Sequence, residues 1–147
     1  MNTWYRVFGQ SDVEPSPAAL LAFLQTLGRE TGGNFRGDDR GWFRAELLID
    51  GTAAVVERYL ADEEGIRGEL NAWAAWVEAT GEGPAQLRLM ERLIGTRQLF
   101  VLRGPATEQA EALCRYLARS TDGVYQADGR GFFDPTGNLL VAEEDEG

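Results

Sequence analysis

Residues 31–43 read TGGNFRGDDRGWF and residues 121–133 read TDGVYQADGRGFF, so part of this chain occurs twice at an offset of 90 residues. The two copies align without a gap over residues 22–43 and 112–133. Nine of the 22 aligned positions are identical: Ala22, Leu27, Arg29, Thr31, Gly33, Asp38, Arg40, Gly41 and Phe43. The repetition predicts two copies of one supersecondary unit.

The first copy begins with a predicted strand at residues 3–9, which are aromatic and β-branched and end at a glycine. Ser16 and Pro17 are a typical N-cap and first helical residue, and apolar residues at helical spacing predict a helix over 17–30. Residues 34–50 look extended, with a turn near 37–39. Residues 53–61 follow a hairpin signal and suit a returning strand, but they also suit a helix, and both readings stay open.

The second copy repeats this order with strands predicted at 98–102 and 138–142, a helix that begins after Thr107, and an extended segment around 125–133. Between the copies, two amphipathic stripes predict a helical hairpin over residues 62–96.

The expected fold is therefore α+β, in one domain that spans residues 1–147. Two β-α-β-β units, residues 3–61 and 97–142, form a mostly antiparallel sheet with the helices on one face, joined by the central helical hairpin. Residues 143–147 form an acidic tail that we expect to fray. Strand order and the oligomeric state are not predicted.

The composition excludes several classes of function. The net charge is −10, which disfavours nucleic acid and anionic membrane surfaces as partners. The chain has no histidine, and all 14 of its basic residues are arginines. It therefore lacks the groups for Ser-His or Cys-His activation, for a histidine-based zinc site, for a Schiff base and for a Walker A loop.

The duplicated Asp-x-Arg-Gly-aromatic element is the first candidate site. Asp38, Arg40 and Trp42 recur as Asp128, Arg130 and Phe132. The functional reading is a paired site in which both arginines hold an anion and Trp42 and Phe132 form a wall beside it, because arginine suits carboxylate and phosphate recognition. The competing reading is a duplicated turn in which each Asp and Arg pair locally and the aromatic residues fill the core.

Trp76 is the second candidate, because it falls at the edge of the apolar stripe of its predicted helix. It is either an exposed anchor for a protein partner or a cap on the rim of the core.

The leading functional expectation is a non-catalytic, cytoplasmic protein-binding or regulatory module, in the manner of an immunity protein, with a basic protein as a possible partner. A small-molecule or anion-binding module that uses Arg40 and Arg130 is the alternative, and a carboxylate-based hydrolase ranks last. We expect no cofactor, no metal and no membrane association. The absence of a signal-like N-terminus and the single Cys114 underlie the cytoplasmic expectation.

Overall fold

The computed structural model describes residues 2–143, which form an α+β fold of four helices and eight strands. In chain order the elements are β1 (Asn2–Gly9), α1 (Pro17–Gln25), β2 (Gly32–Asp38), β3 (Gly41–Ile49), β4 (Thr52–Leu60), α2 (Ile66–Thr80), α3 (Pro84–Ile94), β5 (Gln98–Pro105), α4 (Glu108–Ser120), β6 (Val124–Ala127), β7 (Gly131–Phe133) and β8 (Leu139–Ala142). Residues 53–61, which suited either a strand or a helix, lie almost entirely in strand β4. Of the acidic tail, residues 144–147 lie outside the described part.

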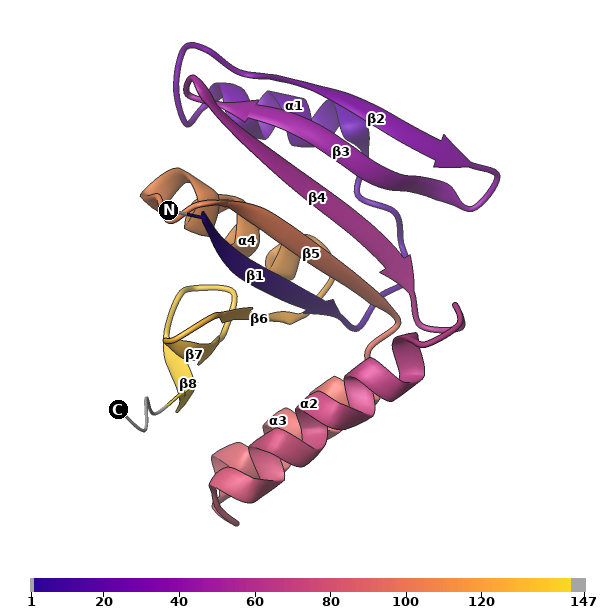
Figure 1. Cartoon of the computed structure of the whole chain (residues 1–147), viewed down its shortest axis with the longest axis vertical. Coiled ribbons are helices and arrows are strands. Elements are labelled where there is room, and N and C mark those ends of the chain that lie inside the picture. The colour runs from indigo at the N-terminus through magenta and orange to yellow at the C-terminus, as the bar shows by residue number, and fades with distance from the viewer. Residues whose placement is uncertain (1, 144–147) are drawn as a thin grey trace.

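All eight strands belong to one sheet in the order β2-β3-β4-β5-β1-β6-β7-β8, and every neighbouring pair is antiparallel (Figure 1). The first strand of the chain, β1, lies between β5 and β6. The first half of the chain therefore supplies a central strand to the second half. In return, β5 from the second half pairs with β4 from the first.

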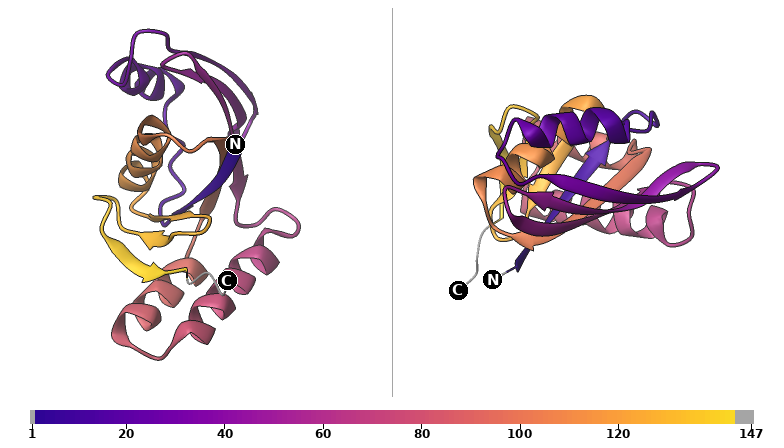
Figure 2. Two further views of the ribbon diagram at one scale, coloured as in Figure 1. Left: turned by 60° about the vertical axis from the view of Figure 1, so that its left-hand side comes forward. Right: turned by 90° about the horizontal axis from the view of Figure 1, so that it is seen from above.

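Helices cover both faces of the sheet, so the expectation that they all lie on one face is wrong (Figure 2). Helices α1 and α4 pack over a buried cluster that includes Tyr5 and Val7 of β1. Helices α2 and α3 pack over a second cluster that includes Phe8 of the same strand. Consecutive strand residues point to opposite faces, and β1 is apolar on both, so each face needs a cover.

The helix starts follow the local signals in the sequence. The Ser16 hydroxyl accepts a hydrogen bond from the Ala19 amide at the start of α1, and the Thr107 hydroxyl accepts one from the Ala110 amide at the start of α4. These side-chain caps satisfy amide groups that have no partner inside the helix. None of the helices in the described part of the chain is long and apolar enough to cross a membrane.

The aligned aromatic residues of the two copies point to opposite faces. Trp42 is buried in the cluster under α1 and α4, whereas its counterpart Phe132 is buried in the cluster under α2 and α3. The cause is a β-bulge: Arg36 pairs with Arg44 and Gly37 with Trp42, which leaves Phe43 without a partner. The β6–β7 ladder has no such interruption.

Candidate functional site

The turn between β2 and β3 holds the first copy of the duplicated motif. An Asp38 carboxylate oxygen accepts a hydrogen bond of 2.9 Å from the backbone amide of Arg40, which closes the turn. The Arg40 guanidinium does not pair with Asp38. Its Nη2 lies 2.9 Å from Oδ2 of Asp62, and this contact holds the pKa of the Asp62 carboxyl below its usual range.

Trp42 belongs to the core. Its indole Nε1 donates a 2.9 Å hydrogen bond to the Pro15 carbonyl, and its ring lies against Phe35 and Phe100. It therefore presents no open wall to a ligand and instead anchors the loop before α1.

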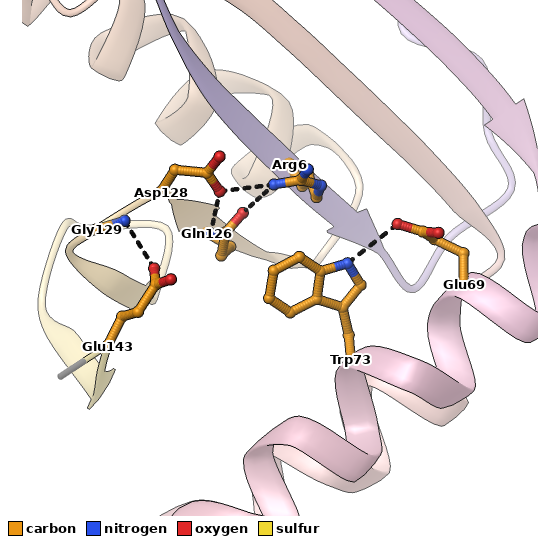
Figure 3. A network of polar contacts seen from close by, with 7 residues as sticks. All are labelled: Arg6, Glu69, Trp73, Gln126, Asp128, Gly129 and Glu143. Atoms are coloured by element: carbon orange, nitrogen blue, oxygen red, sulfur yellow. Dashed lines mark hydrogen bonds and ion pairs between the residues drawn. The ribbon is translucent and has the colours of Figure 1, made fainter. Parts of the chain in front are cut away.

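The second copy of the motif makes different contacts. Asp128 receives two hydrogen bonds of 2.7 Å, one from Nη1 of Arg6 and one from the side-chain amide of Gln126, and Figure 3 shows this network beside Trp73 of α2. The Arg6 guanidinium lies 5.0 Å from the centre of the Trp73 ring, a cation–π contact. Asp128 thus helps to join β1, β6 and α2.

Arg130 pairs with Glu111 of α4 at 3.0 Å, and its guanidinium lies 4.9 Å from the centre of the Phe133 ring. The same Glu111 oxygen accepts a hydrogen bond of 3.0 Å from the Tyr125 hydroxyl. These two donors outweigh partial burial and hold the pKa of the Glu111 carboxyl below its ordinary value.

The structure does not bring Arg40 and Arg130 together. The Arg130 turn lies at the start of β1, where the Asp128 amide bonds to the Trp4 carbonyl. Arg40 lies near the end of β4, where its main-chain carbonyl accepts a hydrogen bond from Arg58, and Arg58 shares a row of the sheet with Phe100 and with Val7 in the second half of β1. The paired site that the repeat suggested would need both arginines in one place, and each is instead engaged by an acid on another element.

Trp76 of α2 is half-buried, with its ring 5.8 Å from that of Phe132. Its remaining exposed surface lines a cavity of about 730 Å³ between the α2 and α3 helices and strand β8, the outermost strand on that side of the sheet.

A cavity of about 760 Å³ lies where β4 ends, between the loop after β1, the start of α2 and the end of α3. We call it the arginine pocket. Its charged lining residues are Asp12, Arg40, Arg58, Asp62, Arg67 and Arg97. Four guanidinium groups against two carboxylates give this pocket a positive balance in a chain whose net charge is −10.

Arg58 differs from the other three arginines because it is buried, with only 4% of its surface exposed. Its Nε donates to the side-chain oxygen of Gln98 at 2.7 Å, and its Nη1 donates to the main-chain carbonyls of Trp42 and Arg40 at 3.0 and 3.3 Å. All these acceptors are neutral. Burial therefore lowers the pKa of Arg58, although Glu14 and Glu63 partly offset the effect through their charge.

The second terminal nitrogen of Arg58, Nη2, differs from Nε and Nη1. It makes no hydrogen bond to any residue from 2 to 143, and no fully enclosed side-chain nitrogen or oxygen in that range lacks a partner. Nη2 must therefore be accessible, and the accessible space that Arg58 lines is the pocket. A buried cation with one open donor is poised to receive an anion.

The other three arginines of the pocket are already engaged. Arg40 pairs with Asp62, and Nη2 of Arg97 lies 3.9 Å from Oδ2 of Asp12. Nη1 of Arg67 donates a 2.8 Å hydrogen bond to the Ile94 carbonyl at the end of α3. Arg58 and Arg67 are thus the two pocket arginines without an ion pair to residues 2–143, and of these two Arg58 alone is buried.

Other reactive groups offer less. Among the carboxyl groups of residues 2–143, those of Asp62, Glu111 and Asp134 have shifted pKa values, and all three are lowered, whereas a general acid requires a raised pKa. Burial raises the pKa of the Cys114 thiol and leaves it protonated. Within residues 2–143, no group of three or more His, Cys, Asp or Glu side chains is placed to hold a metal ion.

Arg58, Arg67 and Arg97 lie outside the repeated segments, so the repeat did not point to them. One signal existed for Arg58: in a strand reading of residues 53–61, Arg58 lies on one face with Ala54, Val56 and Leu60, so an arginine interrupts an otherwise apolar row. A charge on the inward row is unusual and calls for an explanation. The pattern has this meaning only if residues 53–61 form a strand, and the sequence left open whether they form a strand or a helix.

Comparison of the chain with protein-family models, with curated proteins and with solved structures found no match.

Proposed function

We propose that this protein is a non-catalytic, cytoplasmic binding module whose ligand is a small anion held in the arginine pocket. The observation that carries the proposal is the buried Arg58, whose Nη2 is open to the pocket and whose charge has only neutral hydrogen-bond partners.

Electrostatics supports this use of the pocket. None of the ion pairs within residues 2–143 involves Arg58, and the charges of Glu14 and Glu63 offset only part of the cost of burying its charge. An anion at Nη2 would supply the missing charge in a partly desolvated site, where charge-assisted hydrogen bonds are strong. The volume of about 760 Å³ lies within the range of typical small-molecule sites.

Thermal unfolding with and without anions tests the proposal. Phosphate, acetate and longer carboxylates, each at about 10 mM in a chloride-free buffer, are compared, because a ligand that binds only the folded state raises Tm. At least one anion should raise the Tm of the wild type and should lose this effect in Arg58→Gln. Arg36→Gln is the matched control, since Arg36 is an exposed arginine on β2 outside the pocket.

A second proposal, protein binding, draws on the cavity beside Trp76. Strand β8 is the last strand of the sheet, and its outer side pairs with no other strand in residues 2–143. An extended segment of a partner could add to this edge and reach Trp76, as in β-strand addition. Four acidic residues, 143–146, follow β8 in the sequence, which favours a basic partner.

The protein-binding proposal has its own test. Proteins captured from cells on the immobilised wild type are compared with those captured on Trp76→Ala and on Leu139→Pro, which blocks the edge of β8. A partner that both variants lose and Leu87→Ala retains supports this surface. If every captured protein is retained equally by all four forms, the surface is not the binding site.

We also infer that the two halves of the chain derive from one duplicated unit and that residues 62–96 connect them as a helical hairpin. The 90-residue offset supports this inference, as do the order β-α-β-β-β on either side of α2 and α3 and the packing of these two helices against each other.

A further inference from the structure

We propose that the anion of the arginine pocket is a singly charged organic carboxylate with an apolar body. One carboxylate oxygen accepts a hydrogen bond from Nη2 of Arg58, and the hydrocarbon part lies against Leu60 and Ile94. This inference rests on the proposed function and narrows it to a class of ligand.

The hydrogen bonds of Arg58 favour a single charge. A guanidinium holds a carboxylate or a phosphate side-on when two neighbouring nitrogens are free. Here Nε and Nη1 are occupied by Gln98 and by the main-chain carbonyls of Arg40 and Trp42, so Nη2 alone remains. Arg58 can therefore make one end-on contact, which is a poor match for a multiply charged phosphate.

Apart from Arg58, the pocket is close to electrically balanced, because three arginines face two carboxylates and leave an excess of one positive charge. The carboxylates of Asp12 and Asp62 line it and repel a second anionic group. The carbonyl end of α3 also borders it, because Ile94 is the last residue of that helix, and a helix C-terminus carries partial negative charge. A polyphosphate or a nucleotide would meet these groups, whereas the uncharged body of a monocarboxylate would not.

The pocket also offers apolar surface. Leu60, Ala61 and Ile94 are among its lining residues, and Ile94 is 52% exposed. A hydrocarbon group that covers Ile94 and Leu60 would gain free energy in proportion to the apolar area removed from water. A bare inorganic anion gains nothing from this wall.

The test is a titration followed by NMR of the arginine side-chain Nε–H signals, with isothermal titration calorimetry for the affinities. Four probes are used: 4-methylpentanoate, its uncharged amide 4-methylpentanamide, acetate and phosphate. We expect 4-methylpentanoate to shift the Arg58 signal and to bind at least about 10-fold more tightly than each of the other three probes. The amide lacks the charge that strengthens the hydrogen bond, and acetate and phosphate lack the apolar group that would be buried.

Two substitutions on α3 check the apolar wall without touching Arg58. Ile94→Ala should weaken the binding of 4-methylpentanoate by about 3- to 10-fold and leave that of acetate unchanged. Leu87→Ala is the matched control, because Leu87 is similarly exposed on the same helix but does not line the pocket. Arg58→Gln should abolish binding, and because Arg58 is buried its Tm is measured alongside. The probes and the Ile94 variant decide the outcome even if Arg58→Gln fails to fold.

A peptide that ends in a leucine carboxylate, together with its amidated form, distinguishes a free metabolite from the C-terminus of a protein as the source of the carboxylate. The proposal is supported whether 4-methylpentanoate or the peptide binds more tightly, provided that the amide form of that ligand does not bind. If phosphate binds as tightly as 4-methylpentanoate and shifts the Arg58 signal, the ligand class is wrong and the anion site stands. If no probe binds, the anion site fails as well.

Discussion

Tyr59 and Tyr125 hold their hydroxyl protons more tightly than free tyrosine does, as does Tyr5, whose pKa is raised by burial. Burial raises the pKa of Tyr125 to about 12, and the hydrogen bond to Glu111 adds to the effect. Burial also raises the pKa of Tyr59 to about 12, with help from its 2.7 Å hydrogen bond to Glu57. In both cases the folded state favours the neutral hydroxyl.

We expect the free energy of unfolding to fall as the pH rises from about 10 to 12. A tyrosine in the unfolded chain loses its proton near pH 10. A folded-state pKa above that value stabilises the protein fully below about pH 10, and this contribution is lost as the pH rises through the folded pKa. Because the chain has no lysine, no ammonium side chain titrates in the same range. Denaturant unfolding at a series of pH values measures the loss.

Tyr125→Phe should make the decline between pH 10 and 12 shallower, whereas Tyr116→Phe serves as the comparison because the Tyr116 hydroxyl donates no hydrogen bond to residues 2–143. The buried Cys114 thiol also destabilises the fold at alkaline pH, but it contributes equally in all these proteins and cancels in the differences. Identical slopes for wild type and Tyr125→Phe would contradict the assignment.

Single residues also show where prediction from the sequence ends. The sequence identified Asp38, Arg40, Asp128 and Arg130 because they recur, but it could not show which acids the arginines meet. Those acids, Asp62 and Glu111, are distant in sequence and belong to other elements. The recurring Asp-x-Arg-Gly motif indicates that the two segments form the same local turn. The residue that pairs with each arginine depends on tertiary packing.

Among the elements, the β2–β3 hairpin shows how one extra residue redirects a strand. Phe43 is the bulge residue, and its insertion lets Trp42 and Ala45 point to the same buried face. The corresponding β6–β7 ladder of the second copy has no bulge, and Phe133 is buried there instead. A sequence alignment pairs Phe43 with Phe133, but only Phe133 is buried.

Deletion of Phe43 should leave the fold intact and change the free energy of unfolding by no more than about 1 kcal/mol. The deletion makes the ladder regular and keeps Trp42 and Ala45 inward, so the register between β2 and β3 survives. Thermal or denaturant unfolding checks the value.

Deletion of Glu46, another exposed residue of β3, is the matched comparison. Removing Glu46 shifts the inward and outward alternation of β3 by one residue. Buried side chains on one side of the deletion, such as Leu47 and Ile49, then turn towards solvent. The expected cost is roughly 3 kcal/mol or more. If the two deletions lower the free energy of unfolding by similar amounts, the bulge does not determine which face of the sheet Trp42 points to.

At the scale of the whole molecule, charge opposes compactness. The chain has 24 acidic residues against 14 arginines, and its isoelectric point is near 4.5. Raising the NaCl concentration from about 0.02 to 0.2 M at pH 7 should raise Tm, because salt screens the repulsion among the excess carboxylates. The same series near pH 4.5 should show little change. A Tm that does not depend on salt at either pH would contradict this view.

The α+β class and the antiparallel pairing followed from the sequence, but each half has three strands after its first helix where two were expected, and α1 ends at Gln25 where a helix to residue 30 was expected. The arrangement of the sheet was not predicted. Alternation in β1 shows an apolar residue on each side, Val7 and Phe8, but nothing local indicates that β5 and β6 are its neighbours. Nor does it indicate which helices cover which face.

The position of β1 between β5 and β6 has a consequence for how the protein is made. Residues 2–9 leave the ribosome well before their neighbours at 98–105 and 124–127 are synthesised. The β2–β3–β4 meander can form early, while β1 must wait with Tyr5, Val7 and Phe8 uncovered. The middle of the sheet therefore closes only after β5 and β6 have been translated. A nascent chain that stops short of β5 would expose this apolar segment to chaperones and proteases.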